Sequence, residues 1–207
     1  MAPDAFSIGD AFSFAWQRFK KNAVFLLLLG VGLGILSLIA NALQHAIMAA
    51  PLLFAVVYLI VIGINAFASF VMVTACLEVH DYGTIEFDDL TKAFPQFIPY
   101  LIGYVIFGVA IILGYLLLIV PGIFLTVKLF LYMYLVVDKK MNGIDALKLS
   151  YEMTTGHFME LFLFFLSVLV INVIGLLLFG IGLLVTVPIT GIAGAYVYRK
   201  LAQKTFA

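Results

Sequence analysis

Residues 97–137 read FIPYLIGYVIFGVAIILGYLLLIVPGIFLTVKLFLYMYLVV, and Lys128 is the only charged residue among them. A helix advances by about 1.5 Å per residue, so about 20 apolar residues cross a hydrocarbon core about 30 Å thick. The stretch is therefore long enough for two crossings, with a turn expected at Pro121-Gly122. Backbone groups must be hydrogen-bonded within the chain in lipid, so both crossings are expected to be helices.

The rest of the chain repeats this pattern. Hydrophobic residues make up 65% of the 207 residues and charged residues 11%, whereas about a quarter of the residues of a soluble domain are charged. The sequence therefore predicts an all-α polytopic membrane protein, with residues 1–207 forming one integral membrane domain of three helical hairpins. The six predicted spans are 23–43, 52–77, 97–120, 123–137, 158–179 and 182–198.

The charged residues lie on one side of this topology. The links between spans one and two, three and four, and five and six contain no Lys, Arg, Asp or Glu. Because Lys and Arg concentrate in cytoplasmic loops, both termini are predicted to be cytoplasmic. The net charge is zero and the basic residues flank spans, so a bilayer is the expected partner and nucleic acid is not. All acidic residues, and all basic residues except Lys128, fall in 1–22, 78–96, 138–160 and 199–207.

A short amphipathic segment precedes each predicted hairpin. The third begins with Asn142-Gly143-Ile144-Asp145, in which a polar cap is followed by an acid three residues later, as at many helix starts. Such segments are expected to lie along the inner membrane surface as helices. Three units of this kind would be parallel repeats around an axis along the membrane normal. The three segments are 7–21, 86–95 and 143–155.

The first of these segments carries residues suited to the headgroup region. An indole ring and long cationic side chains can each keep an apolar body in lipid and a polar tip in water. The predicted interface anchors are Trp16, Arg18, Lys20 and Lys21.

Lys128 is a candidate functional residue because placing a cation within a membrane costs about 2.5–3.5 kcal/mol on insertion scales. Counting from Pro121 places it roughly 10 Å below the outer surface. Asn172 and Thr186 would lie in the same leaflet, with Asn41 near its boundary. We predict that Lys128 extends its ammonium toward the outer surface; the alternatives are that it anchors neighbouring helices or forms a transport site with these polar residues.

Small and polar residues form a narrow face on each of the first two spans. Such residues let helix backbones approach closely, so these faces are predicted to form the seam of the first hairpin rather than a pore lining. The faces consist of Gly30, Gly34, Ser37 and Asn41 in the first span, and of Asn65, Ser69, Met72 and Cys76 in the second.

The sequence offers no candidate for catalysis. Cys76 is the single cysteine, and the three histidines lack the spacing of a metal site. No nucleophile elbow, phosphate-binding glycine loop or intramembrane aspartate is found. We therefore expect no catalytic residue, no metal ligand and no cofactor.

Several motifs resemble those of the YciC-like bacterial inner-membrane proteins, whose six-helix domain is similar to the membrane portion of certain glycerophosphodiester phosphodiesterases. They are Lys20-Lys21-Asn22, VPGI at 120–123 with Lys128, Asp138, DALKLS at 145–150, MTTGHF at 153–158, GIGLLVTVP at 180–188, and Tyr198-Arg199. The resemblance implies a bacterial inner membrane location, a basic residue after the Pro-Gly turn and a cytoplasmic helix over 146–156. It carries over no catalytic residue.

The favoured function is that of a non-enzymatic scaffold or regulatory partner, because the predicted external loops are too short for a receptor and the cytoplasmic side presents acidic residues for a protein partner. A small-solute or lipid transporter using Lys128 is one alternative. A membrane anchor for a lipid-modifying enzyme is another. The oligomeric state is not specified by these patterns. The acidic residues are Asp81, Glu86, Asp88 and Asp89.

Overall fold

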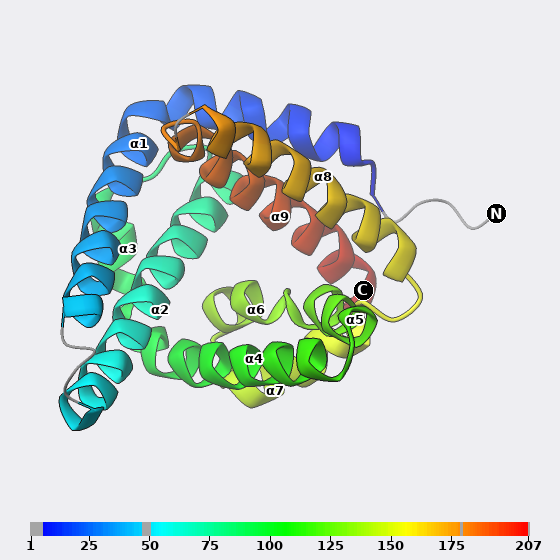
Figure 1. Cartoon of the computed structure of the whole chain (residues 1–207). Coiled ribbons are helices and arrows are strands. Elements are labelled where there is room, and N and C mark those ends of the chain that lie inside the picture. The colour runs from blue at the N-terminus through cyan, green and yellow to red at the C-terminus, as the bar shows by residue number, and fades with distance from the viewer. Residues whose placement is uncertain (1–5, 47–50, 179, 207) are drawn as a thin grey trace.

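The computed structural model describes residues 6–46, 51–178 and 180–206, and all regular elements in these ranges are helices (Figure 1). They are α1 (Ile8–Ala46), α2 (Pro51–Asp81), α3 (Phe87–Ala93), the 3₁₀ turn η1 (Phe94–Gln96), α4 (Phe97–Leu117), α5 (Ile119–Leu129), α6 (Tyr132–Lys139), α7 (Gly143–Met153), α8 (Phe158–Leu177) and α9 (Leu183–Thr205).

Within the described residues, five helical segments are long and apolar enough to cross a membrane. They are Ile8–Ala46, Pro51–Asp81, Phe87–Leu117, Ile119–Lys139 and Phe158–Leu177. The sixth predicted span, 182–198, lies in α9, which is not among the five. Pro188 and the terminal Arg199 and Lys200 make α9 less apolar than the others.

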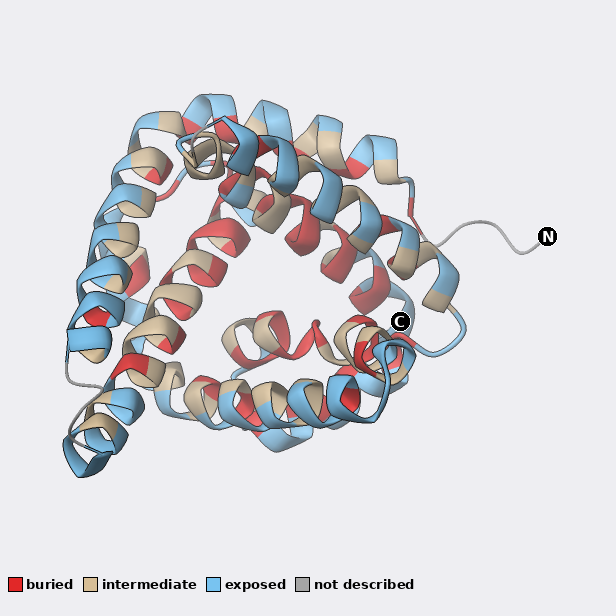
Figure 2. Cartoon of the chain, in the orientation of Figure 1, coloured by how far each residue is buried: buried red, intermediate tan, exposed pale blue. Residues whose placement is uncertain are grey.

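Burial follows the pattern of a bundle surrounded by lipid. The outward faces of α1, α4 and α8 are exposed and apolar, whereas buried residues concentrate on inward faces and on α2, α6 and α9 (Figure 2). Large exposed apolar faces in water would favour aggregation, whereas hydrocarbon solvates them. The exposed residues of these faces include Val24, Leu28, Leu38, Leu116, Leu117, Leu169 and Leu177.

Asn22 divides α1 into two arms that meet at an angle (Figure 1). Its backbone leaves the helical region, with φ −116° and ψ 15°. The side-chain amide donates to the carbonyl of Arg18 at 3.0 Å and to that of Gly83 at 2.9 Å, so the bend is hydrogen-bonded to the loop after α2. This position separates the predicted segments 7–21 and 23–43. The membrane-surface position of the first arm stays a prediction.

The turn between α4 and α5 lies earlier than the sequence predicted. Leu118 is extended, with φ −168° and ψ 160°, and Pro121 and Gly122 are already in the first turn of α5. The prediction of a turn at Pro121-Gly122 and of a helix over 97–120 was therefore wrong. A proline is tolerated here because the first N–H groups of a helix have no intrahelical partner.

Other observed helix boundaries also differ from the predicted ones. The predicted helix over 123–137 is broken at Phe130–Leu131 into α5 and α6, and the segment 86–95 divides into α3 and η1. The last helix runs on to Thr205, so it ends later than the predicted 198. Residues 47–50 in the first predicted link, and residue 179 at the end of the fifth predicted span, lie outside the described residues.

Two sides of the molecule are joined by α2. Helices α1, α8 and α9 lie on one side and α4, α6 and α7 on the other (Figure 1). Helix α7 packs against α4 so closely that a Cβ on Gly143 would lie 2.5 Å from the carbonyl oxygen of Pro99 and 2.8 Å from Cα of Gly103. The buried face of the segment 143–155 packs along α4, α5 and α6, while its position at the membrane surface stays a prediction.

Candidate functional site

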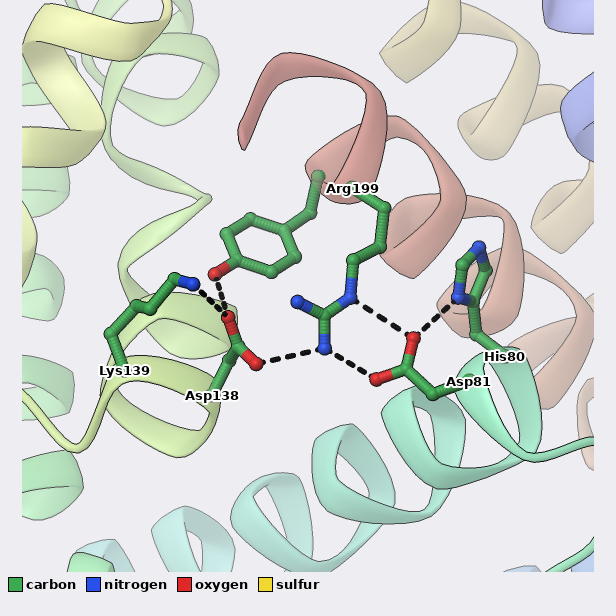
Figure 3. A network of polar contacts seen from close by, with 6 residues as sticks. His80, Asp81, Asp138, Lys139 and Arg199 are labelled. Carbon is green, nitrogen blue, oxygen red and sulfur yellow. Dashed lines mark hydrogen bonds and ion pairs between the residues drawn. The ribbon is translucent and has the colours of Figure 1, made fainter. Parts of the chain in front are cut away.

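An ionic network joins the C-terminal ends of α2, α6 and α9 (Figure 3). Arg199 of α9 donates from Nε to Oδ1 of Asp81 at 3.0 Å and from Nη2 to Oδ1 of Asp138 at 2.8 Å, and Nη2 also contacts Oδ2 of Asp81. One guanidinium thus binds two carboxylates from two other helices. A rigid fork of N–H donors suits this arrangement better than a lysine ammonium.

Three further side chains complete this network, which we call the Arg199 clamp. The hydroxyl of Tyr198 donates to Oδ2 of Asp138 at 2.6 Å, and Nζ of Lys139 lies 3.5 Å from the same oxygen. On the other side, Nδ1 of His80 lies 2.8 Å from Oδ1 of Asp81. The clamp therefore consists of His80, Asp81, Asp138, Lys139, Tyr198 and Arg199.

The clamp holds its charges with limited exposure to solvent. The side chains of Arg199, Asp81 and Asp138 are 24%, 25% and 15% exposed. Burial lowers the pKa of Arg199, but the hydrogen bonds and ion pairs with Asp81 and Asp138 outweigh this effect and raise that pKa above its ordinary value. Arg199 thus remains charged across the physiological pH range, and its removal would leave two poorly solvated carboxylates facing each other.

Lys128 has a different environment, formed by neutral groups of α7 and the turn after it. Its ammonium donates to Oγ1 of Thr155 at 2.9 Å and lies 4.8 Å from the centre of the Tyr151 ring. The residue is only 5% exposed. Both contacts hold α5 against the C-terminal end of α7, which supports the anchoring interpretation of Lys128 rather than the predicted extension toward the outer surface.

The carbonyl of Lys128 is held by the same helix. It accepts from Oγ of Ser150 at 2.9 Å and from Oγ1 of Thr154 at 3.1 Å. Because the chain breaks at Phe130–Leu131, carbonyls at the end of α5 lose their helical partners, and an unpaired carbonyl in lipid costs several kcal/mol. Two hydroxyls from α7 supply those partners. We call these contacts between α5 and Ser150, Tyr151, Thr154 and Thr155 the Lys128 clamp.

The remaining residues of the predicted polar cluster lie elsewhere. Asn172 donates to the Val168 carbonyl at 3.0 Å and to Oγ1 of Thr190 at 3.4 Å, while Asn41 donates to the Ser37 carbonyl at 2.7 Å. Oγ1 of Thr186 packs against Gly175. Among the described residues, no hydrogen bond of Asn41, Asn172 or Thr186 reaches Lys128, so the structure does not bring the four together.

The small-residue faces of α1 and α2 border a groove of about 380 Å³ rather than a closed seam. A Cβ on Gly34 would meet nothing within 4 Å, and one on Gly30 would first meet Leu184 of α9 at 3.7 Å. The predicted close backbone approach at Gly34 was therefore wrong. The groove is uncharged and is lined by Gly30, Gly34, Ser37, Ser69, Leu184 and Pro188, among others.

Two polar residues of α2 make internal contacts near this groove. Oγ of Ser69 lies 2.7 Å from the hydroxyl of Tyr100 on α4, which links α2 to the other side of the molecule. Asn65 donates to the carbonyl of Val61, four residues earlier in its own helix, at 3.0 Å. Ser69 therefore connects helices, whereas Asn65 does not.

The predicted interface anchors cluster on the first arm of α1. Trp16 is 47% exposed and stacks on Phe19, and Nζ of Lys20 lies 5.8 Å from the Trp16 ring. Arg18 extends toward Gly83 and lies 5.1 Å from the Phe14 ring, while Lys21 is exposed. The role of these side chains in a headgroup layer stays a prediction.

The carboxylates of the predicted acidic strip also make contacts within the chain, although Glu86 and Asp88 stay exposed. Asp81 belongs to the Arg199 clamp, and Asp89 forms a capping box with Glu86, whose N–H donates to Oδ2 of Asp89 at 3.0 Å. Asp88 pairs with Lys92 at 2.8 Å. These carboxylates stabilise local structure.

The described residues contain no group of three or more His, Cys, Asp or Glu side chains placed to hold a metal ion. Cys76 is fully buried and contacts the carbonyl of Pro188 at 3.8 Å. The polar groups that the structure does bring together connect helices.

The fold and these contacts define an all-helical protein with several helices competent to enter a membrane. The chain is similar to the uncharacterized protein Rv2560 of Mycobacterium tuberculosis, with 25% identity over 95% of this chain and 69% of the relative. The uncharacterized protein Mb2590 of Mycobacterium bovis is 24% identical over the same shares. No family model and no solved structure matches the chain.

The Arg199 clamp was not predicted from the sequence, because Asp138 and Arg199 were used for topology and the family resemblance and Asp81 was assigned to a partner-binding strip. A signal was present, since Asp81, Asp138 and Arg199 each follow the second apolar block of a predicted hairpin. Equivalent positions in three repeated units would approach one another near a common axis.

Proposed function

We propose that the protein is a non-catalytic scaffold of the bacterial inner membrane that presents a rigid cytoplasmic face to a protein partner. The observation that supports this proposal is that polar side chains in the structure connect helices to one another. Arg199 joins three helices, and Lys128, the one cation inside a predicted span, packs at 5% exposure against α7.

The proposal includes six spans, with α9 as the last. The part of α9 before Arg199, residues 183–198, is about 24 Å long, so it would cross a hydrocarbon core about 30 Å thick with local thinning of the bilayer. Pro188 and two glycines also reduce its apolar character. Both termini and the Arg199 clamp would then lie on the cytoplasmic side, in agreement with the positive-inside rule.

Thiol labelling in intact cells tests this topology. In a Cys76→Ser background, cysteines at the exposed Leu118 and Ile181 should react with an impermeant reagent from outside, and cysteines at Asn142 and Thr205 only after the cells are opened. Labelling of the Thr205 position from outside would contradict the six-span arrangement.

Tyr82 offers a defined position for testing the partner hypothesis. It directly follows Asp81 of the Arg199 clamp and its residue is 77% exposed, so a partner bound beside the clamp could contact it. Ile181, between α8 and α9, is 71% exposed and lies next to the opposite end of α9 from the clamp, so it provides a matched control.

A photoreactive residue placed at Tyr82 in living cells should yield one discrete protein adduct, and the same residue at Ile181 should not. Identical adducts at both positions would indicate nonspecific capture. An absence of adducts at Tyr82 in a stable, correctly inserted variant would contradict the scaffold function.

A lipid transporter is the second candidate, favoured by the groove between α1, α2 and α9. Its volume of about 380 Å³ could hold part of an acyl chain, and its lining is uncharged. Replacing Gly34 by Phe should fill the groove. A transporter would lose flux in proteoliposomes after this change, whereas a scaffold would retain its Tyr82 adduct.

A further inference from the structure

A hollow of about 390 Å³ lies beside the Arg199 clamp, between the last turns of α6 and α9. Two cations contribute to its wall, one from each helix, together with an amide and an aromatic ring. The lining residues are Lys139, Arg199, Ala202, Gln203 and Phe206. Arg199 and Gln203 are four residues apart, so they project from the same face of α9.

The cations of this hollow retain donors that the clamp does not use. Nη1 of Arg199 takes no part in the bonds to Asp81 and Asp138, which involve Nε and Nη2. Lys139 is 41% exposed and has three N–H donors, of which only one can point at Asp138. The hollow therefore presents N–H groups from two helices to a ligand.

The local charge balance favours an anion. Besides Arg199 and Lys139, the ends of α6 and α9 carry Lys140, Lys200 and Lys204, which gives five cations. Asp81, Asp138 and the neighbouring Glu78 give three carboxylates. The C-terminal ends of α2, α6 and α9 each add about half a negative charge, so a positive excess of roughly half a charge remains.

Phe206 gives the hollow an apolar edge. Its ring is 52% exposed and lies 4.9 Å from Nζ of Lys139, so an apolar surface and an ammonium adjoin at the same rim. A free anion would make no favourable apolar contact with this ring, whereas the glycerol and acyl parts of a lipid would cover it. Basic pockets between the cytoplasmic ends of membrane helices suit lipid phosphates.

We propose that this hollow binds the phosphate of an anionic phospholipid of the cytoplasmic leaflet, with Lys139, Arg199 and Gln203 as donors. The assignment rests on the proposed six-span topology, which places the end of α9 at that surface. It adds a lipid ligand to the scaffold function.

Lipid retention by the purified protein tests the assignment. The protein is transferred to detergent with phosphatidylglycerol or phosphatidylcholine, and bound lipid is counted by native mass spectrometry. Wild-type protein should retain phosphatidylglycerol preferentially. Lys139→Gln should weaken that binding about fivefold, since one cation near a lipid surface contributes about 1 kcal/mol. Gln203→Leu should weaken it as well.

Lys148→Gln is the charge-matched control, because Lys148 is 73% exposed on α7 and does not line the hollow. Equal losses in Lys139→Gln and Lys148→Gln would overturn the site, since any lysine would then suffice. Displacement of the lipid by millimolar inorganic phosphate would overturn the lipid assignment in favour of a free anion. Retention of both lipids alike by the wild-type protein would also overturn it.

Thiol labelling at Thr205 separates this inference from the proposed topology. Loss of lipid preference with Thr205 labelled only from inside would refute the lipid site and leave the scaffold proposal intact. Labelling of Thr205 from outside would refute the topology itself.

Discussion

The α4–α7 region and the α1–α2 pair both contain glycines, yet they pack in opposite ways. In the first region, Gly143 and Gly103 bring α7 against α4 with no space for an added Cβ. In the second, Gly34 borders a groove and an added Cβ would meet nothing within 4 Å. A small residue permits close packing, but a second helix must also pack against it.

In the α4–α7 region, α7 packs closely because polar contacts attach it to α5. Ser150 and Thr154 of α7 bind the carbonyl of Lys128, and Thr155 binds its ammonium. The α1–α2 pair is connected instead at the bend of α1, where Asn22 donates to the carbonyl of Gly83 in the loop after α2. The Arg199 clamp then joins α2 and α9 to α6 of the other region.

Breaking the connection between the two regions should have the largest effect. Arg199→Gln leaves Asp81 and Asp138 without their shared cation, at a cost of about 3 kcal/mol for a partly exposed network. We expect the thermal midpoint in detergent to fall by about 10 °C. Lys200→Gln, which changes the neighbouring cation outside the clamp, should leave the midpoint nearly unchanged. Equal midpoints for the two variants would contradict a role of Arg199 in stability.

Adding a single methyl group to the closely packed region should have the next largest effect. The Cβ in Gly143→Ala would meet backbone atoms of Pro99 and Gly103, so α7 must move away from α4. Overpacking of this kind costs about 2 kcal/mol. Thermal unfolding in detergent measures the loss, and a stability equal to that of the wild type would show that the two helices are farther apart than described.

Replacing the ammonium of the Lys128 clamp should have a smaller effect. In Lys128→Gln the side-chain amide can still donate to Thr155, and the backbone carbonyl keeps Ser150 and Thr154. The contacts of the ammonium with the Tyr151 and Phe124 rings are lost. We expect a loss of about 1 kcal/mol. Expression and partner adducts at Tyr82 should be unchanged. Loss of function at unchanged stability would instead favour a transport role for Lys128.

The smallest effect is expected from Gly34→Ala, the counterpart of Gly143→Ala in the open region. The new methyl group meets no neighbour, and alanine favours a helix over glycine by about 1 kcal/mol. The thermal midpoint should therefore stay the same or rise slightly. A loss comparable to that of Gly143→Ala would mean that α1 and α2 are closely packed at this level in the membrane.

Local patterns in the sequence predicted the helical class and most helix positions, because hydrophobic length and charge distribution act within each segment. They also located the bend near Asn22. The turn at Leu118 was missed because Pro121 and Gly122 are equally compatible with a first helical turn.

The contacts of the candidate sites depended on long-range packing. Residues Ser150–Thr155 were predicted as part of the amphipathic segment 143–155, but nothing in their spacing revealed that they bind Lys128, more than 20 residues earlier. The Arg199 clamp joins residues up to 118 positions apart. Hydrophobic periodicity cannot specify which helix ends meet, although the equivalent positions of Asp81, Asp138 and Arg199 offered a hint.

The most direct measurement compares Arg199→Gln with the triple variant Arg199→Gln, Asp81→Asn, Asp138→Asn by thermal unfolding in one detergent. If the charges form a structural clamp, neutralising both carboxylates removes their uncompensated repulsion, and the triple variant should recover at least half of the stability lost in Arg199→Gln. A triple variant no more stable than Arg199→Gln alone would contradict the clamp.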